Sequence, residues 1–184
     1  MRYLIGLLVT IAVIIFVIIR LLSGGSSTPS GQTQALASLA TTDSVVRLTI
    51  SNPVQASEKH REVRITVGRD LTDFALYKGY DESLVRTKTY SMNEASFANF
   101  LRALDLSGNY TKGNDDPALK DERGYCGLGD RYVYEILDGD GNVKQHYWST
   151  SCGQKTFKGR ADTVQTLFKK QVPDYFELTS DVEF

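Results

Sequence analysis

The chain has 184 residues, of which 41% are hydrophobic and 23% are charged. Its 21 Lys and Arg residues nearly balance its 22 Asp and Glu residues, which excludes a strongly basic nucleic-acid-binding protein. The hydrophobic fraction is too high for a chain that is disordered throughout. Two His and two Cys leave little material for a zinc site and none for an iron–sulfur cluster, so we expect no metal and no cofactor.

An apolar segment opens the sequence. Residues 3–19 carry no charge, and Arg20 follows them. A helix needs about 20 mostly apolar residues to cross the hydrocarbon core of a membrane. We therefore predict that residues 1–22 are a transmembrane signal anchor, with residues 3–22 in contact with the membrane. The alternative is a cleaved signal peptide, but its apolar core is only about 7–15 residues long and is followed closely by a cleavage site.

The segments after the anchor define a linker and one domain. Arg2 favours a cytoplasmic N-terminus under the positive-inside rule, which leaves the rest of the chain outside the cytoplasm. Residues 23–42 have no charge and begin with a Gly- and Ser-rich run, so we predict a flexible linker there. Residues 32–40 have the composition of a short helix, although the sequence does not show what would bury it. Residues 43–184 form the predicted extracytoplasmic domain.

Six segments of this domain have the alternating pattern or the β-branched composition of strands. They are residues 46–50, 63–67, 74–77, 84–90, 131–137 and 143–149. The first four follow one another closely, which favours an antiparallel meander because parallel strands need long crossovers. The sequence DGDGN at residues 138–142 predicts a hairpin turn between the last two strands.

Two helices are predicted, one over about 92–105 and one over about 160–171, from apolar residues at helical spacing. Ser91 and Glu94 have the spacing of a capping box at the start of the first helix. Residues 107–130 form a long loop. The order ββββ-α-ββ-α after an N-terminal transmembrane helix predicts an α+β fold, in which two helices cover one face of an antiparallel sheet of about six strands.

The only cysteines, Cys126 and Cys152, flank the predicted hairpin. Since the outer ends of hairpin strands lie close together, we expect a disulfide, which requires an oxidising compartment. Two free thiols or a nucleophilic cysteine are the alternatives. His146 lies between the cysteines in the sequence, and His60 lies in a predicted turn. Either histidine would need a catalytic partner that the sequence does not identify, so a polar surface role is the simpler interpretation.

Acidic residues gather in the predicted loop at positions 114–123. They are Asp115, Asp116, Asp121 and Glu122. The DGDGN turn is similar to part of a calcium loop, but the positions for the required Gly and Glu of an EF-hand hold Val143 and Ser149, which excludes that motif. An adventitious calcium site and a solvated acidic loop both remain consistent with this composition.

The aromatic pair Tyr147 and Trp148 is the predicted binding surface. Large rings are enriched at binding surfaces, and consecutive strand residues point to opposite faces of a sheet. We expect one of the two rings to pack beneath a helix and the other to be exposed and to contact a partner.

The Arg-flanked anchor, the Gly/Ser linker and the segments DERGYC, RYVYEI, YWSTSC and QVPDY resemble single-pass envelope proteins of candidate-phylum bacteria. The resemblance covers most of the chain and implies a bacterial surface location. It transfers no catalytic residue and no ligand.

The sequence therefore predicts a membrane-tethered extracytoplasmic binding or structural domain at the bacterial cell envelope. Its partner would be an envelope protein or a cell-wall component, and nucleic acid is not expected. The alternative is a tethered envelope hydrolase that uses the acidic residues of the 114–123 loop. No motif of a known catalytic class occurs, so an enzyme is the second hypothesis and not the first.

Overall fold

The computed structural model describes residues 36–153 and 155–182. The predicted anchor at residues 1–22 and the first part of the predicted linker lie outside the described residues. Within the part of the chain that the structure describes, no helix is long and apolar enough to cross a membrane.

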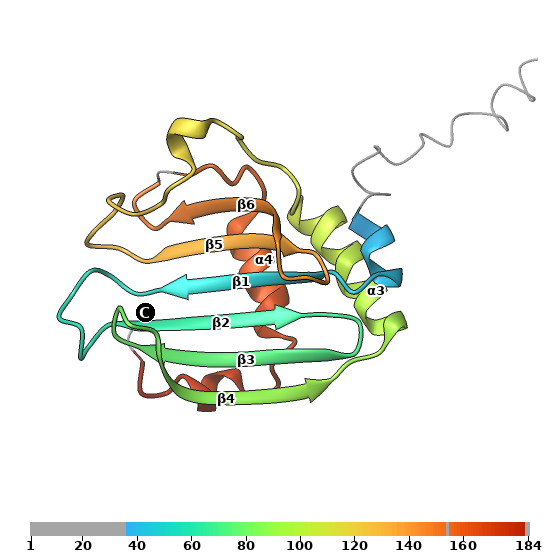
Figure 1. Cartoon of the computed structure of the whole chain (residues 1–184), viewed down its shortest axis with the longest axis horizontal. Helices are drawn as coiled ribbons and strands as arrows, with labels where there is room; N and C mark the ends of the chain where they lie inside the picture. The colour runs from blue at the N-terminus through green and yellow to red at the C-terminus, as the bar shows by residue number, and fades with distance from the viewer. Residues whose placement is uncertain (1–35, 154, 183–184) are drawn as a thin grey trace, which may run out of the picture. The chain divides into compact units, whose positions relative to one another are not determined.

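All six predicted strands are present, and they form one antiparallel sheet in the order β4-β3-β2-β1-β5-β6 (Figure 1). The strands are β1 (Val45–Ser51), β2 (Arg61–Val67), β3 (Leu71–Lys78), β4 (Ser83–Ser91), β5 (Arg131–Leu137) and β6 (Val143–Thr150). The first four strands make the predicted meander, and β5 returns to pair with β1 on its other side. The two edges of the sheet are therefore β4 and β6.

Helices follow the strands as predicted, with small changes at their ends. They are α3 (Glu94–Ala103), the π-helical turn η2 (Leu104–Gly108), α4 (Ala161–Lys169) and the short α5 (Tyr175–Leu178). The predicted cap of the first helix is wrong, because Ser91 is the last residue of β4. Asn93 caps α3 instead, since its side chain accepts a hydrogen bond from the amide of Ser96 at 2.9 Å.

The core lies between one face of the sheet and these helices. Val46, Leu48 and Ile50 alternate along β1 and are all buried on this face, while Phe100 and Phe168 pack edge to face between α3 and α4. This arrangement confirms the predicted α+β fold, with helices on one face of the sheet (Figure 1).

Part of the predicted linker belongs to this core. Residues 36–38 are helical and lead into the 3-10 turn η1 (Leu39–Thr41). Leu36 is 1% exposed and Ala40 is 5% exposed, and both belong to the core cluster. The packed domain therefore includes residues that precede the predicted start at residue 43.

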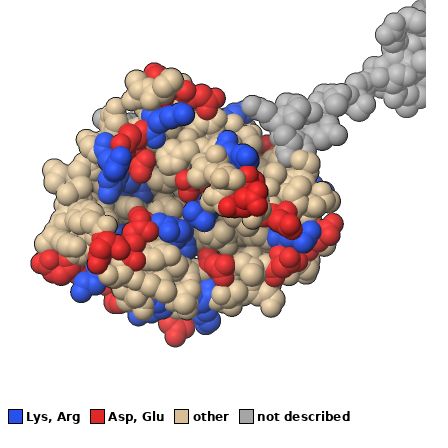
Figure 2. Space-filling model, viewed as in Figure 1, with Lys and Arg blue, Asp and Glu red and all other residues tan. Residues whose placement is uncertain are grey.

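The other face of the sheet is polar, because every strand turns its alternate residues toward it. We call it the open face. Arg47, Arg64 and Glu135 lie on it, and Figure 2, which views the molecule from this side, shows acidic and basic side chains intermixed. The long segment between η2 and β5, which contains the 3-10 turn η3 (Pro117–Leu119), passes beside β6 (Figure 1).

Candidate binding groove at the edge of the sheet

Residues 114–123, which we call the arch, pass over the outer edge of β6 and are bonded to both of its faces. On the core face, the hydroxyl of Tyr147 donates to Oδ1 of Asp115 at 3.0 Å. On the open face, Nε1 of Trp148 donates to the carbonyl of Leu119 at 2.7 Å. The arch therefore straddles the edge strand, because consecutive residues of β6 bond to it from opposite sides.

The predicted alternation of Tyr147 and Trp148 is confirmed, but the predicted exposed ring is absent. Tyr147 is 8% exposed and Trp148 is 1% exposed. Trp148 does turn away from the helices, yet the ring of Tyr125 packs on it with centroids 5.0 Å apart. A loop more than twenty residues away in sequence covers this ring, which is why the strand pattern alone leads to the wrong exposure.

The edge of β6 is closed near its C-terminal end by a second segment. The carbonyl of Trp148 accepts hydrogen bonds from the amides of Thr156 and Phe157, both at 2.9 Å. The carbonyl of Thr156 in turn accepts from the amide of Asn114 at 2.8 Å. Residues around Thr156 thus lie as a short extra strand between β6 and the start of the arch.

A groove of about 990 Å³ lies between the arch and the remaining edge of β6. This volume is at the upper end of the range of about 300–1,000 Å³ that is typical of ligand pockets. Its lining comes from the arch, from β6 and from the extra strand: Asn114, Asp115, Pro117, Leu119, Lys120, Asp121, Glu122, Arg123, Val143, Lys144, Gln145, His146, Tyr147 and Thr156.

His146 connects β6 to the arch and to β5 through two carboxylates. Its Nε2 lies 3.3 Å from Oε2 of Glu122 on the arch, and its Nδ1 lies 3.0 Å from Oε1 of Glu135 on β5. These hydrogen bonds, with the one to Glu122 first, raise the pKa of His146 to about 9, so the ring is an imidazolium at neutral pH. Arg47 lies 3.8 Å from the other oxygen of Glu135 and extends the row of alternating charges.

Each acidic residue of the arch has a hydrogen-bond partner. Arg123 donates three hydrogen bonds to Asp121 and lowers the pKa of that carboxyl to about 2. Asp116 accepts from the amide of Ala118 at 2.9 Å and caps η3. The hydrogen bond with His146 lowers the pKa of Glu122. Among the described residues, no group of three or more His, Cys, Asp or Glu side chains is arranged to hold a metal ion.

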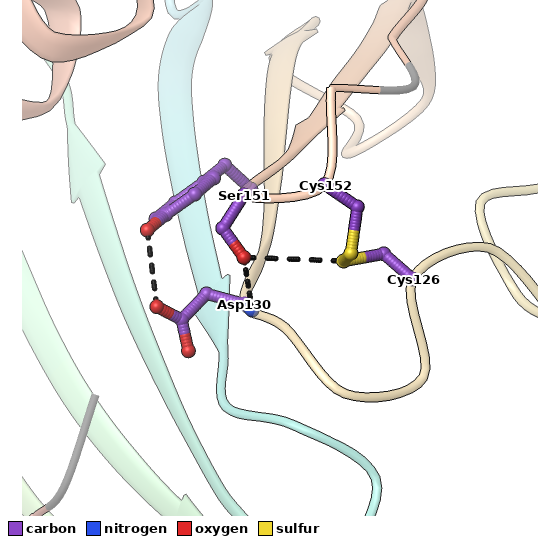
Figure 3. The surroundings of a disulfide bond; sticks show 5 residues. Cys126, Asp130, Ser151 and Cys152 are labelled. Carbon is purple, nitrogen blue, oxygen red and sulfur yellow. Dashed lines mark hydrogen bonds between the residues drawn. A yellow bond between two sulfur atoms is a disulfide. The ribbon is translucent and has the colours of Figure 1, made fainter.

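The disulfide predicted between Cys126 and Cys152 is present, and it fastens the segment after the arch to the end of β6. Figure 3 shows Ser151 beside it, with its hydroxyl accepting a hydrogen bond from the amide of Asp130 at 3.0 Å. A Cβ atom on Gly129 would lie 2.2 Å from this hydroxyl and 2.5 Å from the sulfur of Cys126, so only glycine fits there.

The sequence did not reveal the link between the arch and β6. His146 was interpreted as a polar residue on a strand, but its partner Glu122 lies 24 positions earlier in a segment with no periodic pattern. His60, the other histidine, lies in the connection between β1 and β2 and stacks on the ring of Tyr80 with centroids 4.2 Å apart. It therefore lies outside the groove lining.

Comparison with known protein families finds no family that this chain matches, and comparison with curated proteins finds no relative. The groove must therefore be interpreted from its own geometry.

Proposed function

We propose that this protein is a membrane-tethered binding domain at the bacterial cell envelope, with residues 43–184 outside the cytoplasm. The partner is an envelope protein or a cell-wall component. The observation that carries the proposal is the groove of about 990 Å³ between the arch and the edge of β6. It is a concave site in which polar groups converge, a feature that it shares with ligand-binding sites.

The location rests on three features of the chain. Residues 3–22 are long enough and apolar enough to cross a membrane, and Arg2 precedes them. The pair Cys126 and Cys152 forms a disulfide, and structural disulfides persist in compartments outside the reducing cytosol.

Binding fits the groove better than hydrolysis does. A carboxyl group that acts as a general acid needs a raised pKa, whereas the pKa values of Asp121 and Glu122 are lowered by Arg123 and His146. His146 is itself held between two carboxylates, so both of its ring nitrogens are engaged. A general base would need one of these nitrogens to be free for the substrate.

Site-specific photo-cross-linking in intact cells tests this proposal. A benzophenone amino acid replaces Val143, an exposed residue of the groove lining, in the full-length protein, and the same amino acid replaces Thr89 on β4 as the control. We expect irradiation to give discrete higher-mass adducts from position 143 and none from position 89. Equal adducts at both positions, or none at either, would contradict a binding groove under the arch.

Protease added to spheroplasts tests the location in the same strain. We expect residues 43–184 to be digested while a cytoplasmic control protein stays intact. Full protection of the domain would contradict an extracytoplasmic location.

A further inference from the structure

We infer that the groove binds a short extended peptide that carries a carboxylate, and that the peptide joins the sheet as an added strand on β6. The inference rests on the proposed function and names the chemical class of its partner.

The backbone of β6 offers hydrogen-bonding groups at this edge. The amide and the carbonyl of Trp148 both point away from β5, because they bond to Thr156 and Phe157 on the outer side. Backbone groups on a strand alternate in direction, so the amide and the carbonyl of His146 also point outward. No backbone group of the described residues pairs with them. The amide and the carbonyl of His146 are therefore the next outward-pointing backbone groups along this edge. They lack a backbone partner among the described residues, and they lie on the side of β6 that the arch crosses.

The lining shows that the groove follows the edge itself. Gln145 and Tyr147 lie on the core face of β6 and His146 lies on the open face, yet all three line the same groove. Residues 143–147 span about 17 Å in an extended conformation. The register of β6 with β5 shifts at Lys144, which is a bulge that interrupts the regular pairing there. The strand that fits is consequently short, with His146 at its centre.

The charges in the lining favour an anionic group on the peptide. Arg123 is paired with Asp121, and Lys144 is paired with Asp138 at 2.9 Å. His146 is paired with Glu122. Lys120 is the one lining cation with no ion pair among the described residues. A carboxylate from an acidic side chain or from the end of the peptide fits beside its ammonium group.

The aromatic content of the lining argues against a sugar ligand. Sugars bind where an aromatic ring offers a flat exposed face. Among the described residues that line the groove, Tyr147 is the only aromatic one, and it is 8% exposed. A Cβ atom on Gly113 would lie 2.1 Å from the ring of Tyr147, which shows how closely the backbone covers it. A peptide needs no such ring, because its main chain supplies the hydrogen bonds of an added strand.

Two peptide libraries test the inference on the full-length protein in detergent micelles. One contains acetylated hexapeptide amides with a fixed central glutamate and Val, Thr or Ser elsewhere. The other has the same composition without glutamate and ends in a free carboxylate. We expect members of at least one library to bind with a Kd below about 1 mM by fluorescence anisotropy. The library that binds identifies the source of the carboxylate.

Two controls separate strand addition from charge attraction. N-methylation of the alternate peptide amides that face β6 should weaken the best binder at least tenfold, because each methyl group removes a donor. Lys120→Gln should weaken binding about two- to fivefold, within the range typical of one exposed charge contact, and the matched variant Lys88→Gln on β4 should leave it unchanged.

The outcomes distinguish this inference from the proposed function. If no library member binds, or if N-methylation at every position leaves the affinity unchanged, strand addition is wrong. Photo-cross-links from position 143 in cells would then still support a binding domain with a different kind of ligand. If position 143 gives no cross-link, the proposed function fails independently of the peptide result.

Discussion

The two edges of the sheet are protected in different ways. Strand β4 is exposed over most of its length, and its side chains Arg86 and Lys88 pair with Asp181 and Asp174 in the C-terminal segment. Strand β6 carries the buried Trp148 and is covered by the arch. Charged residues on an edge strand discourage pairing with another chain. Strand β4 is protected by its charged residues, whereas β6 is protected by the arch that covers it.

The difference between the edges is the basis for placing the proposed binding site at β6. None of the described residues that line the groove comes from β4. The arch is bonded to β6 at only a few of the described residues and leaves a groove of about 990 Å³ between itself and the strand. The contacts that hold the arch should therefore contribute much more to stability than comparable positions on β4 do.

Removal of the Trp148 side chain should have the largest effect on the free energy of unfolding. Trp148→Ala empties the space between β6 and the arch and removes the hydrogen bond to Leu119. We expect the free energy of unfolding to fall by about 3–5 kcal/mol, as for other buried tryptophans. Urea denaturation followed by circular dichroism measures this change. Surface substitutions usually change the free energy of unfolding by less than about 1 kcal/mol. A loss below this value would show that the arch does not pack on β6.

Loss of the disulfide should have the next largest effect. The double variant Cys126→Ser, Cys152→Ser opens a loop with a sequence separation of 26. We expect it to lower the free energy of unfolding by about 3 kcal/mol, since the disulfide restricts the unfolded chain. Thermal unfolding of the variant, compared with the oxidised wild-type protein, measures the loss. Identical melting temperatures for the oxidised wild type and the variant would contradict this role.

His146 should stabilise the arch in a pH-dependent manner. The pKa of His146 is raised to about 9, so its contribution is complete below about 6.5 and is lost as the pH rises through 9. The pKa of Glu122 is lowered, so its contribution is present above its usual value of about 4.5 and is lost as the pH falls. The ion pair should therefore contribute fully between about pH 4.5 and 6.5.

We expect His146→Gln to lower the free energy of unfolding by about 1–2 kcal/mol in this window, the usual scale for hydrogen bonds between charged groups. The difference from the wild type should shrink as the pH rises toward 9. Urea midpoints at a series of pH values measure it. A difference that stays constant across pH would mean that His146 acts through packing and not through charge.

A substitution on the other edge should have the smallest effect. Thr89 on β4 is exposed, and its hydroxyl bonds to Asp73 at 2.7 Å. We expect Thr89→Ala to change the free energy of unfolding by less than about 0.5 kcal/mol, as at most surface positions. Urea denaturation provides the comparison with Trp148→Ala. A loss as large as that of Trp148→Ala would remove the contrast between the edges.

The sequence predicted the sheet well because its signals are local. Alternation along residues 131–137 reproduces β5 with the same bounds, and the DGDGN turn fixes its pairing with β6. The disulfide was predictable for the same reason, since hairpin geometry brings its two cysteines together. The cap of α3 was misplaced because Ser91 continues a strand, and Asn93 was the nearer capping residue.

The groove was not predictable, because it depends on contacts between distant parts of the chain. The arch contains four acidic residues and Pro117, with no periodicity that would indicate which strand it crosses. Its attachment points are Tyr147, His146 and Trp148, whose partners lie from 24 to 32 positions earlier. The sequence singled out Tyr147 and Trp148, but it predicted that one of the two rings would be exposed and would contact a partner. Both side chains are instead buried and donate hydrogen bonds to the arch, which lines one side of the groove.

Hydrogen–deuterium exchange in native membranes tests the central claim most directly. The full-length protein is compared in its own membranes, where the partner is present, and after purification in detergent. If the groove under the arch is the binding site, peptides that cover residues 114–123 and 143–147 should exchange more slowly in membranes, while residues 83–91 of β4 exchange equally in both. Equal exchange at β6, or protection at β4 alone, would contradict the account.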